Sequence, residues 1–306
     1  MAAIEITTKI GCKNACIYCP QDTFIKSYTK RSKIFQMSFN VFKKCIDKIP
    51  SSVDVWFSGM CEPCLNPKYK KMLLYAHKKG HKIELYTTLV GMNLSDVDFL
   101  ESLNNLIMII HLPFYGYLTS DKYYEKININ ENYLKLLNRM CKSSIIVKYV
   151  YHGEYLHPKI ISLIKKNHLK HLRINIRSRN VKIKSFLKRK RGWISCKRNL
   201  NCNILLPNGD VILCCMDWGM KHILGNLLSS NYKSLFQSKE FLKIRKGLKD
   251  EKINILCRYC DIFAYDVDLF ARIYNSFFYL YYYIQNIRSL KDFYHAVQKL
   301  FQKLKC

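Results

Sequence analysis

Short apolar runs alternate with longer stretches of helical spacing along residues 1–180. Six of the runs have the length and composition of buried strands, and they lie near residues 5–9, 53–58, 82–88, 106–112, 145–151 and 171–176. Between them, apolar residues recur every three to four positions, as on the buried face of a helix. Alternation of strand and helix predicts an α/β fold with a mostly parallel sheet and helices outside it. Six such units form a partial (β/α)6 barrel of the TIM-like type.

Two of the expected helices have clear starting residues. Ser38 can cap a helix that buries Cys45 and that Pro50 ends. Asn93 or Ser95 can open another helix before the fourth strand. Cys45 is therefore expected to be a core thiol.

The pattern changes after residue 190. Asn208-Gly209 stands between two apolar runs and predicts a β-hairpin. Helical spacing follows over residues 234–249, and the aromatic-rich segment that ends the sequence again has helical spacing. We therefore expect three units: a barrel over 1–190, a small hairpin-plus-helix domain over 191–262 and a helical extension over 263–306.

Composition narrows the class of protein. The chain has 306 residues, enough for a large core, and 14 cysteines. Its first ten residues include Glu5 and no long apolar leader, so the thiols are expected to be reduced in the cytoplasm, several of them as metal ligands. The apolar run 277–284 is far shorter than the roughly 20 residues of a membrane span. No transmembrane segment is expected.

The charge of the chain is strongly positive and unevenly spread. The formal net charge is +29, and residues 155–209 contain no Asp or Glu. This segment is either a solvated basic surface or a field that attracts an anionic small-molecule substrate, an acidic lipid surface or RNA. If the partner is an anionic small-molecule substrate, Arg177 or Arg179 would bind its anionic group and residues 188–191 would steer it. The aromatic stripes of 263–306 either pack on a core or make a peripheral membrane contact.

A cysteine-rich loop follows the first expected strand. Its cysteines Cys12, Cys16 and Cys19 have the spacing C-x3-C-x2-C. Three thiolates can hold three irons of a [4Fe-4S] cluster and leave the fourth iron open to a substrate or cofactor. The alternative is three buried or zinc-binding cysteines. With Tyr18 before the last cysteine, the loop resembles the signature of the radical S-adenosylmethionine (radical SAM) superfamily.

The resemblance extends to the ends of the next strands. Residues 57–63, Phe-Ser-Gly-Met-Cys-Glu-Pro, are similar to the family's Gly-Gly-Glu-Pro-like turn, which receives the amino group of S-adenosylmethionine. Cys61 replaces the second glycine, and we expect Cys61 and Cys64 to be buried thiols. The resemblance implies that the cofactor contacts Tyr18, Gly59, Glu62, Thr88 and His111.

The second unit resembles the SPASM and twitch domains that follow radical SAM barrels. In that reading an auxiliary [4Fe-4S] cluster is bound by Cys196, Cys214, Cys257 and Cys260. Cys202 or Cys215 could replace one of these ligands, and structural zinc is the alternative metal. The expected cofactors are thus two [4Fe-4S] clusters and S-adenosylmethionine, with a reductant such as flavodoxin or ferredoxin as partner.

The resemblance also implies an activity. Radical SAM enzymes cleave S-adenosylmethionine reductively to a 5′-deoxyadenosyl radical, which takes a hydrogen atom from the substrate. An auxiliary cluster with four cysteines favours oxidation, and our leading expectation is dehydrogenation of a sugar- or cyclitol-like molecule. Peptide maturation and RNA modification are the alternatives within the family. A zinc protein that binds nucleic acid is the alternative outside it. No catalytic residue is assigned.

Overall fold

The computed structural model describes residues 2–14, 16, 19–118, 121–124, 127–152, 155–173, 191–196, 198, 201–260 and 265–266. Several expectations fall outside these ranges. They concern Tyr18, Arg177, Arg179, residues 188–190 and nearly all of the extension over 263–306.

Nine strands form one sheet in the order β13-β12-β11-β1-β2-β3-β4-β7-β9. Six of them occupy the six predicted places: β1 (Ala3–Ile6), β2 (Asp54–Phe57), β3 (Ile83–Thr87), β4 (Ile107–His111), β7 (Ile146–Tyr151) and β9 (His171–Arg173). Each pairs with the next in parallel. The expected mostly parallel α/β sheet is confirmed.

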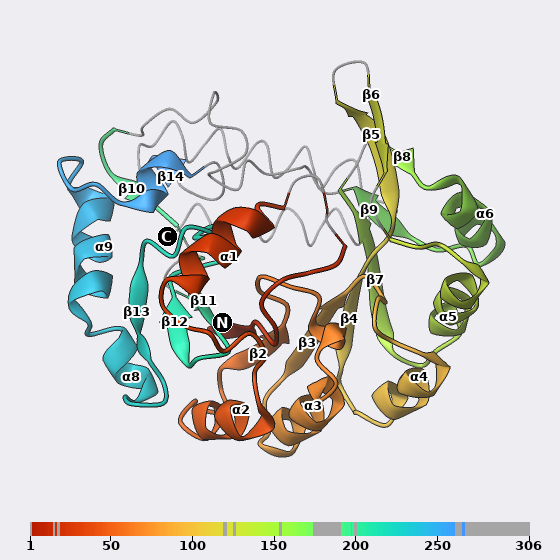
Figure 1. Ribbon diagram of the computed structural model, residues 1–306, viewed down its shortest axis with the longest axis horizontal. Coiled ribbons are helices and arrows are strands. Elements are labelled where there is room, and N and C mark those ends of the chain that lie inside the picture. The colour runs from red at the N-terminus through yellow and green to blue at the C-terminus, as the bar shows by residue number, and fades with distance from the viewer. Residues whose placement is uncertain are drawn as a thin grey trace, which may run out of the picture.

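Helices between these strands lie along the outer side of the curved sheet (Figure 1). They are α2 (Phe39–Ile46), α3 (Tyr69–Lys78), α4 (Leu94–Glu101), α5 (Glu131–Cys141) and α6 (Pro158–Lys166). Two expected caps are present: Ser38 accepts from the backbone of Val41, and Asn93 forms a reciprocal capping box with Asp96. Cys45 is buried, and burial raises the pKa of its thiol to about 11. It is a core residue, as predicted.

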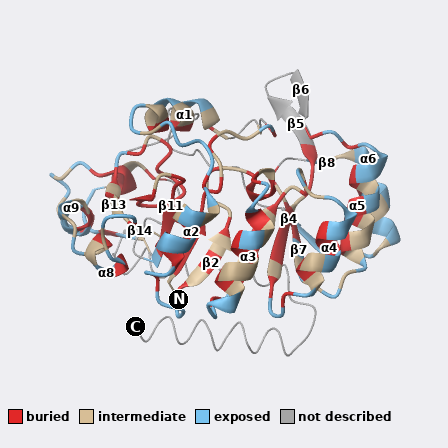
Figure 2. Ribbon diagram, turned by 60° about the horizontal axis from the view of Figure 1, so that its bottom comes forward, coloured by how far each residue is buried: buried red, intermediate tan, exposed pale blue. Residues whose placement is uncertain are grey.

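Buried residues gather on the strands and on the helix faces that turn toward them (Figure 2). The core is therefore the layer between the sheet and the outer helices, with Phe42, Phe57 and Met72 among its fully buried side chains. Helix α1 (Gln21–Thr29) is placed differently, because it directly follows the cysteine loop. No helix in the described ranges is long and apolar enough to cross a membrane.

The second unit continues the barrel sheet. Strand β11 (Cys202–Leu205) pairs with β1 in parallel. Strand β12 (Asp210–Ile212) is antiparallel to β11 and to β13 (Ile223–Asn226). The predicted turn is present, with Gly209 at φ +85°, a conformation that favours glycine. The sheet therefore runs across the expected boundary near residue 190, and the division into three units stays a prediction.

The helix predicted over residues 234–249 is two helices. The chain forms α8 (Tyr232–Leu235), leaves the helical path, and restarts as α9 (Lys239–Lys249). Ser238 is the reason for the restart, since it has extended backbone and its hydroxyl accepts from Phe241 N. A short 3₁₀ turn at Leu256–Tyr259 follows, and β10 (Ile194–Ser195) pairs with β14 (Tyr265–Asp266). A three-stranded sheet of β5 (Phe114–Leu118), β6 (Asp121–Tyr124) and β8 (Tyr155–Leu156) was not predicted.

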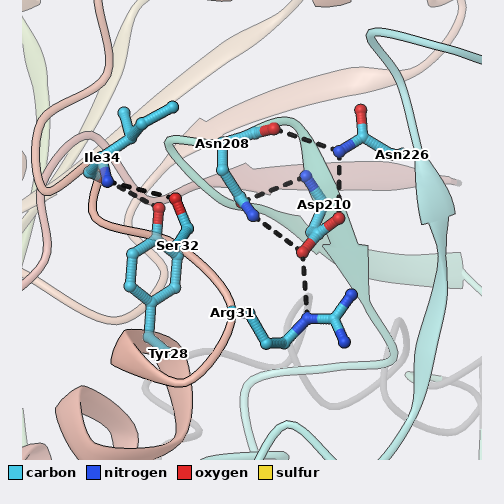
Figure 3. Close-up of polar contacts among 7 residues, drawn as sticks. All are labelled: Tyr28, Arg31, Ser32, Ile34, Asn208, Asp210 and Asn226. Atoms are coloured by element: carbon cyan, nitrogen blue, oxygen red, sulfur yellow. Dashed lines mark hydrogen bonds and ion pairs between the residues drawn. The ribbon is translucent and has the colours of Figure 1, made fainter.

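Polar contacts fasten the hairpin to the segment after α1 (Figure 3). Asp210 accepts from Asn208 Nδ2 at 2.8 Å, from Asn226 Nδ2 at 3.0 Å and from Arg31 Nε at 3.3 Å. Asn226 also donates to the carbonyl of Asn208. One buried carboxylate thus connects the hairpin turn and the end of β13 to Arg31, a residue 179 positions earlier in the chain.

Candidate cofactor and substrate cavity

A cavity of about 230 Å³ lies at the carboxyl ends of the parallel strands. This is the face of a barrel where active sites form. Every described residue of the first predicted set lines it: Cys12, Cys16, Cys19, Gly59, Glu62, Thr88 and His111. The structure therefore brings together residues that are up to 99 positions apart in the sequence.

The cysteine loop is held against the neighbouring strand ends. Asn14 Nδ2 donates to Thr88 Oγ1 at 2.8 Å, and Gln21 Nε2 donates to the carbonyl of Met60 and to Cys19 Sγ. The loop also has an internal bond from Cys19 N to Cys16 O at 2.9 Å. Three thiols on one loop that open to a cavity are a suitable ligand set for iron, so the residues present fit an iron-sulfur cluster.

The turn after β2 requires its one glycine. Gly59 has φ +71°, and a Cβ there would lie 2.3 Å from Thr7 Oγ1. That same hydroxyl accepts from Met60 N at 3.1 Å. Cys61, which replaces the family's second glycine, does not have a positive φ, so its side chain causes no left-handed strain. Of the two thiols expected to be buried, Cys64 is buried, whereas Cys61 is half-buried and lines the cavity. Desolvation raises the pKa of the Cys61 thiol to about 12.

Glu62 is buried and accepts four hydrogen bonds. They come from Thr87 Oγ1 at 2.7 Å, Thr88 Oγ1 at 2.6 Å, Thr88 N at 2.7 Å and Cys64 N at 3.4 Å. Burial raises the pKa of the Glu62 carboxyl, and the hydrogen bonds from Thr88 and Thr87 oppose that shift. Its carboxylate therefore fastens the turn after β2 to the end of β3.

His111 lies in a row of rings that crosses neighbouring strands. It stacks on His152 with ring centroids 5.1 Å apart, and Tyr86 lies 6.4 Å away on the other side. Trp56 continues the row at 6.0 Å from Tyr86. Trp56 and Tyr86 stand inside apolar runs and resemble ordinary core residues, and His152, which follows the fifth expected strand, was given no role, so the sequence assigned a role to His111 alone.

Sequence reasoning also missed the charged residues on the cavity wall. Glu5 of β1 is buried and accepts from Ser58 Oγ at 3.0 Å, Gly59 N at 3.3 Å and Cys202 Sγ at 3.1 Å. Arg198 Nη2 lies 4.0 Å from Glu5 Oε1. A carboxylate inside an apolar strand was the available signal, since such a group is rarely buried without a partner.

The adjacent thiols Cys214 and Cys215 face different surroundings. Cys214 packs in the core cluster that holds Cys257 and Cys260, whereas Cys215 packs beside Met60 and lines the cavity. Cys215 accepts from Arg198 Nη1 at 3.1 Å. The other spare thiol, Cys202, donates to Glu5, and burial raises its pKa. These positions favour Cys214 as the auxiliary ligand over either spare.

The 3₁₀ turn that carries Cys257 and Cys260 is supported by a buried histidine. Leu256 N donates to His222 Nε2 at 3.0 Å, and His222 Nδ1 lies 2.6 Å from Glu240 Oε1. Strand β10, which ends one residue before Cys196, pairs with β14, which begins five residues after Cys260. In the described ranges no three Cys, His, Asp or Glu converge as the ligands of one metal ion do. The thiolates of a [4Fe-4S] cluster instead bind different irons.

Comparison with known proteins agrees with this arrangement. Residues 6–159 match the model of the radical SAM superfamily, which is half of the chain. The chain belongs to the radical SAM superfamily. Residues 196–261 of this radical SAM protein match SPASM, an iron-sulfur cluster-binding domain. Both regions are of types that bind [4Fe-4S] clusters, and the superfamily uses S-adenosylmethionine, so the expected family and cofactors are confirmed.

Solved radical SAM structures have the same fold. BtrN in complex with AdoMet and 2-DOIA is 16% identical, with a TM-score of 0.56, over 85% of this chain and 93% of BtrN. AnSMEcpe with bound AdoMet and the Kp18Cys peptide is 14% identical, with a TM-score of 0.55, over 84% and 87% of the two chains. Streptococcus suis SuiB bound to precursor peptide SuiA is 10% identical, with a TM-score of 0.52, over 85% and 69%. No curated protein matches the sequence.

Proposed function

We propose that this radical SAM enzyme dehydrogenates a hydroxyl group of a sugar- or cyclitol-like small molecule. The observation that carries the proposal is the cavity in which the three loop thiols face the strand-end residues Glu62, Thr88 and His111. When bound, the cofactors would supply reductive cleavage of S-adenosylmethionine and removal of a hydrogen atom from the substrate.

Each part of the cavity has a role in the proposal. Cys12, Cys16 and Cys19 would hold the cluster, and Asn14 and Gln21 keep their loop against the strand ends. The turn from Gly59 to Glu62 would receive the amino group of S-adenosylmethionine, with Glu62 fixing the backbone through the end of β3. Thr88, His111 and Tyr18 would contact the rest of the cofactor.

The auxiliary site supports oxidation as the outcome. Cys214 belongs to the same buried core cluster as Cys257 and Cys260, whereas Cys215 belongs to another cluster and lines the cavity. A cluster bound there by four cysteines, with Cys196 as the fourth, has no open iron for substrate. Its role would then be to accept an electron from the substrate, as a dehydrogenation requires.

The side chains that line the cavity beside the proposed cofactor residues support a small molecule. Glu5 and Arg198 are polar and Trp56 and Tyr86 are aromatic, a combination typical of small-molecule sites. BtrN, a structure of the same fold, was solved with 2-DOIA, whereas SuiB and anSMEcpe were solved with peptides. Peptide modification is therefore the competing function that an experiment must separate.

The test is formation of 5′-deoxyadenosine under anaerobic reducing conditions. The reconstituted enzyme would be offered cyclitols, sugars and peptides, and substrate-dependent 5′-deoxyadenosine would be compared with the amount of ketone formed. We expect a cyclitol or sugar to give both products in equal amounts, and the variant with Cys12, Cys16 and Cys19 changed to Ala to give neither. Coupled turnover with peptides alone would contradict the proposed substrate class.

A further inference from the structure

The cavity wall has two layers, because side chains two positions apart on a strand point to the same side. Ser58, Thr88 and His111 belong to the upper layer, at the strand ends. Two positions earlier on the same strands lie Trp56, Tyr86 and Ile109, which also line the cavity. Glu5 stands opposite Trp56 in the register of β1 and β2, and Tyr86 stands opposite Ile109. The upper layer contains the residues proposed for the cofactor, so the deeper layer has no assigned ligand.

The deeper layer has a strong acceptor and a strong donor side by side. Glu5 is 5% exposed, and Arg198 Nη2 lies 4.0 Å from its Oε1. A carboxylate accepts hydrogen bonds and a guanidinium donates them, so together they can bind neighbouring hydroxyl groups. The second arm of Arg198 is held by Cys215 Sγ at 3.1 Å, which fixes the direction of the guanidinium.

Aromatic rings form the adjoining wall. Trp56 and Tyr86 lie 6.0 Å apart at an angle of 45°, and both line the cavity. The Trp56 indole N–H is buried and has no acceptor among the described residues. A buried donor without an acceptor is unfavourable, and an oxygen of a bound molecule would satisfy it. Flat apolar surface beside a few polar groups is typical of small-molecule sites.

The charge of the cavity differs from that of the chain. The formal net charge of the chain is +29. The described residues that line the cavity, in contrast, include two carboxylates, Glu5 and Glu62, and one guanidinium, Arg198. The guanidinium is already shared between Glu5 and Cys215. A phosphate placed here would meet two carboxylates and compete for a cation that is already engaged. A neutral hydroxylated molecule meets no such repulsion.

We propose that Glu5, Arg198, Trp56 and Tyr86 form the substrate site and that it takes a small polyhydroxylated ring without a phosphate group. Hydroxyls of the ring bind between Glu5 and Arg198, and its C–H face lies on Trp56 and Tyr86. This inference rests on the proposed function and makes it more specific. It differs from the alternative in which the basic segment attracts an anionic substrate through Arg177 or Arg179, which lie outside the described residues.

The experiment measures binding rather than turnover. Full-length, anaerobically reconstituted protein with S-adenosylmethionine and no reductant is titrated with myo-inositol and with myo-inositol monophosphate by calorimetry. We expect myo-inositol to bind at least about tenfold more tightly than its phosphate, and Glu5→Gln to weaken its binding about tenfold or more, because a charged acceptor is lost. Glu131→Gln is the matched control, since Glu131 lies on the solvent side of α5 with its side chain 86% exposed.

A second variant separates substrate binding from the shape of the turn. Glu5 also holds Ser58 and Gly59, so S-adenosylmethionine affinity is measured in Glu5→Gln as well. If the S-adenosylmethionine affinity of Glu5→Gln falls, Trp56→Leu takes the place of Glu5→Gln as the deciding variant. Trp56→Leu is then expected to weaken myo-inositol binding by the same factor of about ten or more.

The outcomes distinguish this inference from the proposed function. Any one of three outcomes overturns the inference alone. In the first, the wild type binds S-adenosylmethionine but no myo-inositol. In the second, the deciding variant binds myo-inositol as tightly as the wild type does. In the third, the wild type binds myo-inositol monophosphate more tightly than myo-inositol. Failure of the wild type to bind S-adenosylmethionine overturns the proposed function itself.

Discussion

Thr88 and Glu62 are joined by two hydrogen bonds across neighbouring strands. The backbone N–H and the hydroxyl of Thr88 both donate to Glu62 Oε2, at 2.7 and 2.6 Å. The same hydroxyl accepts from Asn14 of the cysteine loop. Three segments that would surround S-adenosylmethionine are therefore connected through one carboxylate and one hydroxyl.

Glu62→Ala is expected to weaken S-adenosylmethionine binding while iron content is unchanged. The variant leaves buried donors of Thr87 and Thr88 without an acceptor, so the free energy of unfolding should also fall by about 2 kcal/mol. Calorimetry, iron analysis and denaturant unfolding measure the three quantities. Glu62→Gln is the control, because its amide oxygen can keep part of the acceptor function. Unchanged cofactor affinity in Glu62→Ala would mean that this turn is not the amino-group site.

Iron content tests the two cluster sites together. Two [4Fe-4S] clusters correspond to about eight irons per chain, and changing Cys12, Cys16 and Cys19 to Ala should leave about four. Cys45→Ala serves as the matched control, since this thiol lies on the buried face of α2 and its loss should leave all irons in place. Stoichiometric zinc without the visible absorbance of an iron-sulfur cluster would contradict both assignments.

The choice of auxiliary ligands can be tested with single variants. We expect Cys214→Ala to lose about four irons and Cys202→Ala to lose none, because the Cys202 thiol donates to Glu5 on the barrel side. Cys215→Ala should also retain the auxiliary cluster, since Cys215 packs beside Met60 rather than Cys257. Loss of iron in Cys202→Ala, with Cys214→Ala intact, would reverse the assignment.

The sequence predicted the local elements well because their signals are local. Each of the six parallel strands is an apolar run, and Asn208-Gly209 has the composition of the turn that it forms. The break between α8 and α9 was also local, but the apolar spacing on both sides of Ser238 concealed it. The loop cysteines Cys12, Cys16 and Cys19 stand out in the sequence because they lie within eight residues, whereas the proposed auxiliary set is spread over residues 196–260 and was suggested by the resemblance.

Long-range pairing could not be predicted in the same way. Nothing near Cys202 in the sequence indicates that β11 pairs with β1. In this pairing Cys202 lies opposite Ala3, which is 199 positions earlier in the chain. The surroundings of Glu5 depend on that pairing, because Cys202 and Arg198 reach it only after the chain has returned to the edge of the barrel. The wall that Glu5 and Arg198 form was therefore hidden, whereas the strand-end residues Glu62, Thr88 and His111 that line the same cavity were not.

The hydrogen bonds that Asp210 accepts from Asn208 and Asn226 should stabilise the protein more than the ion pair of Asp210 with Arg31 does. Asp210→Ala removes the acceptor for Asn208 and Asn226, and we expect the free energy of unfolding to fall by about 1–3 kcal/mol. Arg31→Ala should lower it by less than about 1 kcal/mol, because the Arg31 side chain is 47% exposed and its ion pair is screened by water. Denaturant unfolding of both variants measures the difference. Equal effects would mean that the ion pair, not the hairpin contacts, stabilises this junction.

His222 should control how firmly the auxiliary cluster is held. Its Nε2 accepts from Leu256 N, next to Cys257, and its other nitrogen faces Glu240 of α9, so the ring joins the cysteine turn to a helix. In His222→Ala the buried Leu256 N–H has no acceptor, and the turn can move more freely. We expect a chelator to remove about four of about eight irons faster than from wild type, while the other four are released at an unchanged rate. His81→Ala is the control, because His81 is also buried and bonds a carbonyl, that of Val53, on the barrel side. Equal acceleration of all irons in His222→Ala would indicate general destabilisation, and His222 would then have no specific role at the auxiliary site.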